Sequence, residues 1–457
     1  MGMTFLDLSY DLNDIKRLFG AGEEVSASCC LDGSRLITEI EYKGKSYSFS
    51  DEIEAEGEIE FKRLCRRAAK KRLYGVLKEN TGISLPWGSL TGIRPVRLFS
   101  QTVKEMGYEE AQRYFLEFFD VSPSKLELLK RIEKVQRKYL ADDPKICDLY
   151  AGIPFCRGRC SYCSFISAEI EKSAGLIDSY AFCLIKEIEF VKNIIAKNGL
   201  KVNSVYVGGG TPSSLPLEKL EEILAALKDI EAGEFTFEAG RPDSFSEELM
   251  ELLKRAGVNR ISVNPQSSSD ETLKRIGRRH TFSDCVRAFG LSEKYGFIVN
   301  MDIIAGLPGE SLEDFKRTAD AVIALRPHNI TVHTLCVKNG ALLARTDYSH
   351  TECASQMLDY AQNALHNSGY NAYYMYRQKN AAGNLENVGY SLPGFECLYN
   401  IDNMEDSVTV AACGANAISK RVFSGGRIER LANPKDIKTY CSKIDALLEK
   451  KELFFSG

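Results

Sequence analysis

From residue 148 onward, short apolar segments alternate with amphipathic helical segments, and this alternation restricts the possible folds strongly. The apolar segments are predicted strands at residues 149–153, 204–210, 235–240, 260–266, 299–306 and 329–335. Helical periodicity fills the intervals, and one predicted helix opens at Ser311 with Asp314 three residues later, the spacing of a capping box. Six strand and helix units in series predict an α/β fold, a partial (β/α)6 barrel with a parallel sheet.

The segments on either side of this barrel follow other patterns. Residues 24–49 have strand patterning with turns at Asp32-Gly33 and Lys43-Gly44, and residues 60–79 and about 103–140 have helical patterning. We therefore predict an N-terminal α+β extension over residues 1–140 and the barrel core over residues 141–370. Beyond it the chain becomes rich in Gly and Asn and ends in an apolar segment and a helix, which predicts a C-terminal cap or substrate-binding subdomain over residues 371–457.

Charge and hydropathy exclude several classes of partner. The chain has 59 basic and 63 acidic residues, a net charge of -4, so total charge does not attract polyanions. The basic segment at residues 62–78 fits a solvated helix face better than an RNA-binding surface. No apolar run reaches the roughly 18 residues of a membrane span. The sequence predicts a cytoplasmic protein without a nucleic-acid partner.

Three of the 14 cysteines lie together in the segment "CRGRCSYC", as Cys156, Cys160 and Cys163. Most of the others, such as Cys65 and Cys183, are predicted to be small buried residues. A structural zinc site takes four ligands, and no histidine lies near this segment. A [4Fe-4S] cluster usually takes four cysteines, so three would leave one iron open to another ligand.

This segment resembles the CxxxCxxC signature of the radical S-adenosylmethionine (SAM) enzymes, with Tyr162 directly before the last cysteine. The resemblance implies that Cys156, Cys160 and Cys163 bind a [4Fe-4S] cluster and that SAM chelates its open iron. It further implies that one electron cleaves SAM to methionine and a 5'-deoxyadenosyl radical, which takes hydrogen from an unactivated carbon. A flavodoxin- or ferredoxin-like protein is the implied electron donor.

Within this superfamily the chain resembles the oxygen-independent coproporphyrinogen III oxidase, or dehydrogenase, family. The segments that carry the resemblance are "LYAGIPFC", "YVGGGTPSSL", "NPQSSSDETLKRIGRRHT" and "NMDIIAGLPGESLEDF". The segments "LPWGSLTGIRPVRL" and "GNLENVGYSLPGFECLYNI" are similar to its HemZ-type branch. The resemblance implies oxidative decarboxylation of two propionates of coproporphyrinogen III to vinyl groups, which gives protoporphyrinogen IX in heme biosynthesis.

Polar residues at the predicted strand ends match the SAM contacts of the family. A glycine segment ends the second strand, Glu238 the third and Gln266 the fourth, while Asp302 lies in the fifth. The carboxyl ends of parallel strands are where such a barrel places its working residues. By resemblance the SAM contacts are Tyr150, Tyr162, Gly209, Gly210, Thr211, Glu238, Gln266, Arg278, Asp302 and, through its backbone, Cys336.

A tetracarboxylate substrate needs cationic or hydrogen-bonding partners. The candidates for these contacts are Arg279, Arg345, Arg377 and Lys379, with Lys420 and Arg421 further along the chain. The sequence identifies no catalytic side chain.

Other functions fit part of the same pattern. The heme chaperones of this superfamily share the cluster motif and the Cys-x-Phe form seen at Cys163 and Phe165, where the coproporphyrinogen dehydrogenases have a further cysteine. Those chaperones carry a C-terminal His-Asn heme motif, whereas no histidine follows His366 here. A radical SAM methyltransferase acting on heme or another tetrapyrrole, and an RNA-modifying enzyme, are the remaining alternatives.

Overall fold

The computed structural model describes residues 4–140, 143–165, 167–346, 353–379, 381–423 and 427–456. The chain divides into two compact units, Met1–Glu133 and Lys134–Gly457, and the division falls inside helix α5 (Pro123–Gln136). The domain limits expected at 140/141 and 370/371 stay predictions, and residues 141–142 lie outside the described ranges.

The first unit is built on a small antiparallel sheet with the order β1-β2-β3-β4. The turn at residues 43–44 lies where it was predicted, and the other lies at residues 33–34, one residue after the predicted position. Helices α1 and α2 pack on one face, where Leu36 and Ile40 of the sheet share a core with Leu73 and Leu77. The elements are β1 (Thr4–Phe5), α1 (Ser9–Leu18), β2 (Val25–Asp32), β3 (Arg35–Tyr42), β4 (Lys45–Glu52) and α2 (Glu58–Thr81).

The helical segment predicted for about 103–140 is several shorter helices. The chain breaks near Gly107 and again near Asp120, and both residues adopt positive φ angles, of 87° and 59°. A continuous helix requires negative φ at every residue, so it ends at each of these positions. The helices are α3 (Pro95–Met106), α4 (Tyr108–Arg113), a π-helical turn (Tyr114–Phe118) and α5.

The second unit holds a mixed sheet, which in the described residues has 11 strands in the order β13-β14-β12-β11-β10-β9-β8-β5-β15-β16-β17. The six predicted strands are the parallel run from β12 to β5, which confirms the α/β fold. They are β5 (Ile146–Ile153), β8 (Lys201–Gly209), β9 (Glu234–Gly240), β10 (Arg260–Val263), β11 (Ile298–Ala305) and β12 (Asn329–Thr334).

Strands from the C-terminal part of the chain extend this sheet at both ends. Strand β15 (Thr409–Cys413) pairs in parallel with β5, a neighbour that the sequence did not predict. The remaining strands pair antiparallel; they are β13 (Asn371–Arg377), β14 (Glu386–Ser391), β16 (Ile418–Val422) and β17 (Ile428–Ala432). The predicted cap segment therefore completes the barrel sheet.

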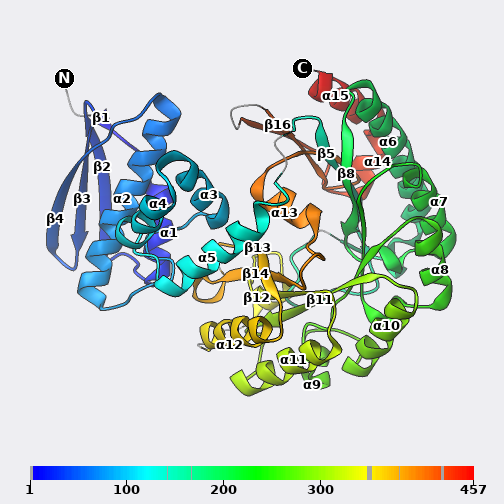
Figure 1. Cartoon of the computed structure of the whole chain (residues 1–457). Helices are drawn as coiled ribbons and strands as arrows, with labels where there is room; N and C mark the ends of the chain where they lie inside the picture. Colours follow the sequence, from blue (N-terminus) through cyan, green and yellow to red (C-terminus); the bar gives the residue numbers. More distant parts are fainter. Residues whose placement is uncertain are drawn as a thin grey trace. The chain divides into compact units, whose positions relative to one another are not determined.

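Helices lie along the outer side of the curved sheet (Figure 1). The predicted capping box is present at the start of α11: the Ser311 amide donates to the Asp314 carboxylate at 2.9 Å, and the Asp314 amide donates to the Ser311 hydroxyl at 3.2 Å. The outer helices are α6 (Ile177–Lys197), α7 (Leu217–Leu227), α8 (Glu247–Arg255), α9 (Asp270–Arg275), α10 (Phe282–Lys294), α11 (Leu312–Leu325) and α12 (Ala354–Asn367), with α14 (Ile437–Ser442) and α15 (Ile444–Ser456) beside α6.

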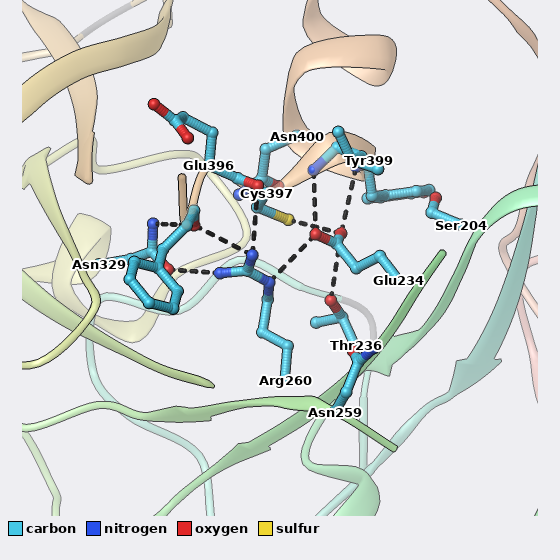
Figure 2. A network of polar contacts seen from close by, with 12 residues as sticks. Ser204, Glu234, Thr236, Asn259, Arg260, Asn329, Glu396, Cys397, Tyr399 and Asn400 are labelled. Atoms are coloured by element: carbon cyan, nitrogen blue, oxygen red, sulfur yellow. Dashed lines mark hydrogen bonds and ion pairs between the residues drawn. The ribbon is translucent and has the colours of Figure 1, made fainter. Parts of the chain in front are cut away.

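One helix, α13 (Leu398–Glu405), is anchored at the amino ends of the parallel strands. Glu234 and Arg260, each the first residue of its strand, form a buried ion pair with Nε and Oε2 3.1 Å apart. The Glu234 carboxylate accepts from the amides of Leu398 and Tyr399 at 3.0 and 3.3 Å, where the helix dipole favours negative charge. Figure 2 shows this network, in which the Cys397 thiol also donates to Glu234.

The described helices include none that is both long enough and apolar enough to cross a membrane.

Candidate functional site

The three clustered cysteines lie on a loop that leaves the carboxyl end of β5. Cys156 belongs to a two-residue strand, β6 (Phe155–Cys156), which pairs with β7 (Ala168–Glu169) and closes the base of the loop. The Cys163 amide donates to the Cys160 carbonyl at 3.1 Å, so the two cysteines share a tight turn. The loop therefore carries all three cysteines on one short stretch of chain at the carboxyl end of β5.

Contacts from outside the loop hold it against the barrel. The Ser161 amide donates to the Ile276 carbonyl at 3.0 Å, and the Ser161 carbonyl accepts from the Leu343 amide at 2.8 Å. The Arg159 guanidinium donates to the Gly340 carbonyl at 2.6 Å. These anchors could not be predicted from the sequence, because the partners lie more than 100 residues away along the chain.

The glycine segment at the end of β8 lies directly against the cysteine loop. Gly209 adopts a φ of 116°, and a Cβ at Gly210 would lie 2.5 Å from the Phe155 carbonyl oxygen and 3.0 Å from the Cys156 sulfur. The Thr211 hydroxyl donates to the same sulfur at 3.5 Å. A side chain at this position would displace the cysteine loop, so glycine here lets the chain after β8 pack directly on that loop.

Glu238 lies at the end of the neighbouring strand β9, beside the glycine segment. The Tyr206 hydroxyl donates to its Oε1. Burial raises the pKa of Glu238, the charge of Asp302 raises it further, and the hydrogen bond from Tyr206 opposes both effects. A carboxylate in this setting is stabilised by a bound cation, such as the ammonium group of an amino acid.

The pKa of Asp302, in β11, is shifted in the opposite direction to that of Glu238. Burial would raise its pKa, but contacts with His333, Asn300 and Thr331 together lower the pKa below the usual value. The Asn300 amide donates to Oδ1 at 2.7 Å, and His333 Nε2 lies 3.7 Å from Oδ2. Asp302 is therefore an ionised acceptor beside a carboxylate, Glu238, that protonates more readily.

Several buried polar atoms near these residues have no hydrogen-bond partner within the described chain. They include the Gln266 Oε1, the Arg278 Nε and the Ser161 hydroxyl. Gln266 itself is fixed by its backbone, which exchanges hydrogen bonds with Asp302 and Ile304 at 2.9 and 3.0 Å. Buried polar groups are normally paired, so this set fits a polar ligand at the site.

The remaining predicted SAM contacts surround the same region. The Arg278 guanidinium donates to the Tyr162 hydroxyl at 3.3 Å and to the Asn264 carbonyl at 2.6 Å. Cys336 forms an isolated bridge with Ala381 after the end of β12. Tyr150, in β5, faces the barrel interior in a stack described below.

The donor set fits a [4Fe-4S] cluster better than a single metal ion. Across the part of the chain that the structure describes, no three His, Cys, Asp or Glu side chains converge on a point where one ion would lie. A cubane cluster takes each thiolate at a different iron, so its cysteines do not converge on a point. Three clustered cysteines beside a glycine cradle meet this requirement.

Stacked tyrosines close the barrel interior beneath the site. Tyr399 of α13 stacks on Tyr206 with ring centroids 4.2 Å apart and on Tyr150 at 6.2 Å. Since Tyr206 also bonds Glu238, the α13 anchor supports the predicted SAM pocket from below. The alternation along β8 could have indicated Tyr206, two residues before Gly208, but no local signal pointed to Tyr399.

The predicted substrate cations are not brought together. Arg279, Arg345 and Lys379 are exposed at separate positions. Arg377 is buried in the β13–β14 hairpin opposite Glu386, and its Nη2 donates to the Asn384 carbonyl at 3.2 Å. Burial lowers the pKa of Arg377 to about 10.

Comparison with known proteins agrees with this arrangement. The Radical SAM superfamily matches residues 150–322. In the solved structure of the coproporphyrinogen III oxidase HemN of Escherichia coli, a radical SAM enzyme, the same fold recurs with a TM-score of 0.54 and 22% identity, over 68% of this chain and 71% of that one. The superfamily implies a [4Fe-4S] cluster and SAM as cofactors, as predicted.

Curated relatives give a closer assignment. The heme chaperone HemW of Escherichia coli is 30% identical over 62% of this chain and 72% of its own length. The oxygen-independent coproporphyrinogen-III oxidase-like protein HemZ of Bacillus subtilis is 38% identical over 82% of this chain and 78% of its own length. The chain therefore belongs to the radical SAM superfamily and, within it, to the family of the HemZ coproporphyrinogen-III oxidase-like proteins.

Proposed function

We propose that this protein is an oxygen-independent coproporphyrinogen III dehydrogenase. It would convert two propionate side chains of coproporphyrinogen III to vinyl groups and give protoporphyrinogen IX. Counted from the protonated acid, each conversion passes one hydrogen atom to the SAM-derived radical, releases carbon dioxide and a proton, and passes one electron to an electron acceptor. The observation that carries the proposal is the three-cysteine loop packed on the glycine segment beside Glu238, in a chain similar to HemZ over most of its length. A flavodoxin- or ferredoxin-like protein would supply electrons to the cluster.

In this proposal the cofactors are held at the carboxyl ends of the parallel strands. Cys156, Cys160 and Cys163 hold the cluster, and the backbone of Gly209 and Gly210 lines the SAM site next to it. When bound, the cluster and SAM together supply a carbon radical that removes a hydrogen atom from the substrate.

The polar side chains of the barrel orient SAM. Glu238 accepts from the ammonium group, and its hydrogen bond from Tyr206 fixes the carboxylate in place. Asp302 stays ionised and accepts from the ribose hydroxyls. The unpaired atoms of Gln266 and Arg278 take the remaining polar groups of SAM, with the arginine close to its carboxylate.

The tetrapyrrole reaches this site through the open end of the barrel. The tyrosine stack at Tyr150, Tyr206 and Tyr399 fills the barrel interior toward α13 and leaves little room there for a substrate. The exposed cations Arg279, Arg345 and Lys379 are then candidates for propionates that do not react.

A second candidate function is heme binding, and one residue favours it. Phe165, two positions after the last cluster cysteine, is 68% exposed, so it presents an apolar ring that could pack on a porphyrin face. Similarity to the heme chaperone HemW supports the same alternative. A heme chaperone would bind heme tightly at one site per chain, and a dehydrogenase would instead consume coproporphyrinogen.

An anaerobic assay of the reconstituted protein separates the two functions. We expect the dehydrogenase to lower the mass of coproporphyrinogen III by one carbon dioxide and two hydrogens for each propionate converted, with 5'-deoxyadenosine formed alongside. Deoxyadenosine formed while all four propionates stay intact would overturn the dehydrogenase proposal. Stoichiometric uptake of heme by the same preparation would favour the chaperone.

A further inference from the structure

Two side chains that sequence reasoning did not single out, His333 and Tyr376, lie next to the predicted SAM contacts. His333 is in β12 and Tyr376 in β13. The Tyr376 hydroxyl lies 3.3 Å from His333 Nδ1, and His333 Nε2 lies 3.7 Å from the Asp302 carboxylate. The three groups form a polar chain from β11 across to β13.

Strand register places this chain on the inner face of the sheet. Thr331 pairs with Asp302 in the ladder between β12 and β11, and His333 is two residues further on the same face. Tyr376 pairs with Asn387 of β14, the strand between β13 and β12. Because Asn387 uses its short side chain to bond the backbone of Tyr376 and Thr334, the longer Tyr376 side chain reaches past it to His333.

The barrel interior opens to solvent at the level of this polar chain. One step lower, Tyr374 and Thr331 are only 6% and 2% exposed. The His333 side chain is 26% exposed, although it lies on the inner face, and the Asp302 side chain, level with Thr331, is still 17% exposed. Further down, the interior cavity bounded by Tyr206, Thr236 and Asn300 measures about 20 Å³, room for roughly one water molecule. A ligand that enters the barrel therefore meets His333 and Tyr376 at its floor.

A ligand carboxylate next to His333 and Tyr376 needs hydrogen-bond donors, because Glu238 and Asp302 lie close by and repel the ligand when they are ionised. Burial raises the pKa of Tyr376, and the charges of Asp302, Cys336 and Glu238 add to this effect. The phenol therefore keeps its hydrogen. In the tautomer with its hydrogen on Nδ1, the His333 ring donates to the Tyr376 oxygen, which leaves the tyrosine hydrogen free to turn toward a ligand.

We propose that Tyr376, supported by His333, binds a propionate carboxylate of the tetrapyrrole and holds that propionate beside the SAM site. The inference rests on the proposed function and names the contact that selects this substrate class. Tyr376 touches the substrate, and His333 acts as a positioning residue.

The test is a binding titration that does not depend on turnover. Reconstituted full-length protein is titrated with coproporphyrin III and with its tetramethyl ester, and SAM affinity is measured separately. We expect the wild type to prefer the free acid. Tyr376→Phe should weaken binding of the acid roughly tenfold, because it removes one hydrogen bond to a charged group. Its affinities for the ester and for SAM should stay unchanged.

A matched control removes a tyrosine hydroxyl elsewhere. Tyr360 lies on α12, and its hydroxyl donates to Asp320 on the outer side of the barrel at 2.7 Å. Tyr360→Phe should bind the acid, the ester and SAM as the wild type does. His333→Gln provides a second variant, and we expect it to weaken binding of the acid more than binding of the ester.

Three outcomes would overturn the inference. Tyr376→Phe could bind the acid as tightly as the wild type, it could lose SAM and porphyrin affinity together, or the wild type could bind the acid and the ester equally. The first and third outcomes would show that no carboxylate binds at this position. The second outcome would show that Tyr376 only supports Asp302. If Tyr376→Phe weakens acid binding as expected but the wild type forms no decarboxylated product, the carboxylate site stands and the dehydrogenase proposal fails.

Discussion

Replacing Gly210 by alanine adds one Cβ atom, which should displace the cysteine loop. The new Cβ would lie 2.5 Å from the Phe155 carbonyl oxygen; the backbone fixes the position of the Cβ and the oxygen is itself backbone, so neither atom can rotate away. Relief requires the cysteine loop to move away from β8, which also shifts the Cys156 sulfur now 3.0 Å from that Cβ position. Forcing an extra methyl group into a packed region costs about 1–3 kcal/mol.

The assay has two readouts on the same preparations. Urea unfolding of the metal-free protein measures the free energy of unfolding, which should fall by about 1–3 kcal/mol in Gly210→Ala. Iron content after anaerobic reconstitution should fall as well, because the loop that carries Cys156 is displaced. Gly210→Ala with wild-type stability and wild-type iron content would refute the packing of the glycine segment on the loop.

Gly290 supplies the matched control. It lies in the exposed face of α10, and a Cβ built there meets no atom within 4 Å. Alanine in a helix is favoured over glycine by about 1 kcal/mol, so Gly290→Ala should stabilise the protein slightly and leave its iron content unchanged. The same chemical substitution is thus expected to have opposite effects at the two positions.

Three further predictions concern the cluster, the SAM site and the α13 anchor. Cys160→Ala should remove the visible absorption of the cluster and leave the far-ultraviolet circular dichroism unchanged; normal iron content would contradict the ligand assignment. Burial raises the pKa of Glu238, and the carboxylate binds SAM only when it is ionised. SAM affinity should therefore be lost as the pH falls through this pKa, at a higher pH than for an ordinary glutamate. An equilibrium binding series should show this step in the wild type and not in Glu238→Gln, and the same step in both would exclude Glu238 as its origin. Arg260→Leu should cost about 3–5 kcal/mol, since it leaves Glu234 buried without its partner, and adding Glu234→Leu should recover part of the loss. Equal unfolding free energies for the single and double variants would show that the buried charge is not what destabilises the single one.

The central part of the fold could be predicted because its signals are local. Each of the six parallel strands is a short apolar run next to a helix of clear periodicity, and the capping box at Ser311 needs only two residues three positions apart. Glu238 and Asp302 could be placed for the same reason. Once the strands are known, the carboxyl ends of a parallel sheet bring such residues to one edge.

The unpredicted features depend on partners far apart in the chain. Strand β15 is the run "TVAAC", buried at all five positions, and nothing in its own sequence shows that it pairs with β5 more than 250 residues earlier. Glu234 and Arg260 look like surface charges at strand starts, yet they are buried because α13 covers them. The side chains of His333 and Tyr376, on the inner faces of β12 and β13, meet only because β14 is inserted between these strands.

The most direct test of the proposed chemistry follows one hydrogen atom. Coproporphyrinogen III deuterated at the propionate carbon β to the carboxylate is incubated anaerobically with the reconstituted protein, SAM and a reductant, and the 5'-deoxyadenosine is analysed by mass spectrometry. We predict that it gains one deuterium while the tetrapyrrole loses carbon dioxide. Deoxyadenosine without deuterium, together with an unchanged tetrapyrrole, would contradict hydrogen abstraction from the propionate and with it the proposed function.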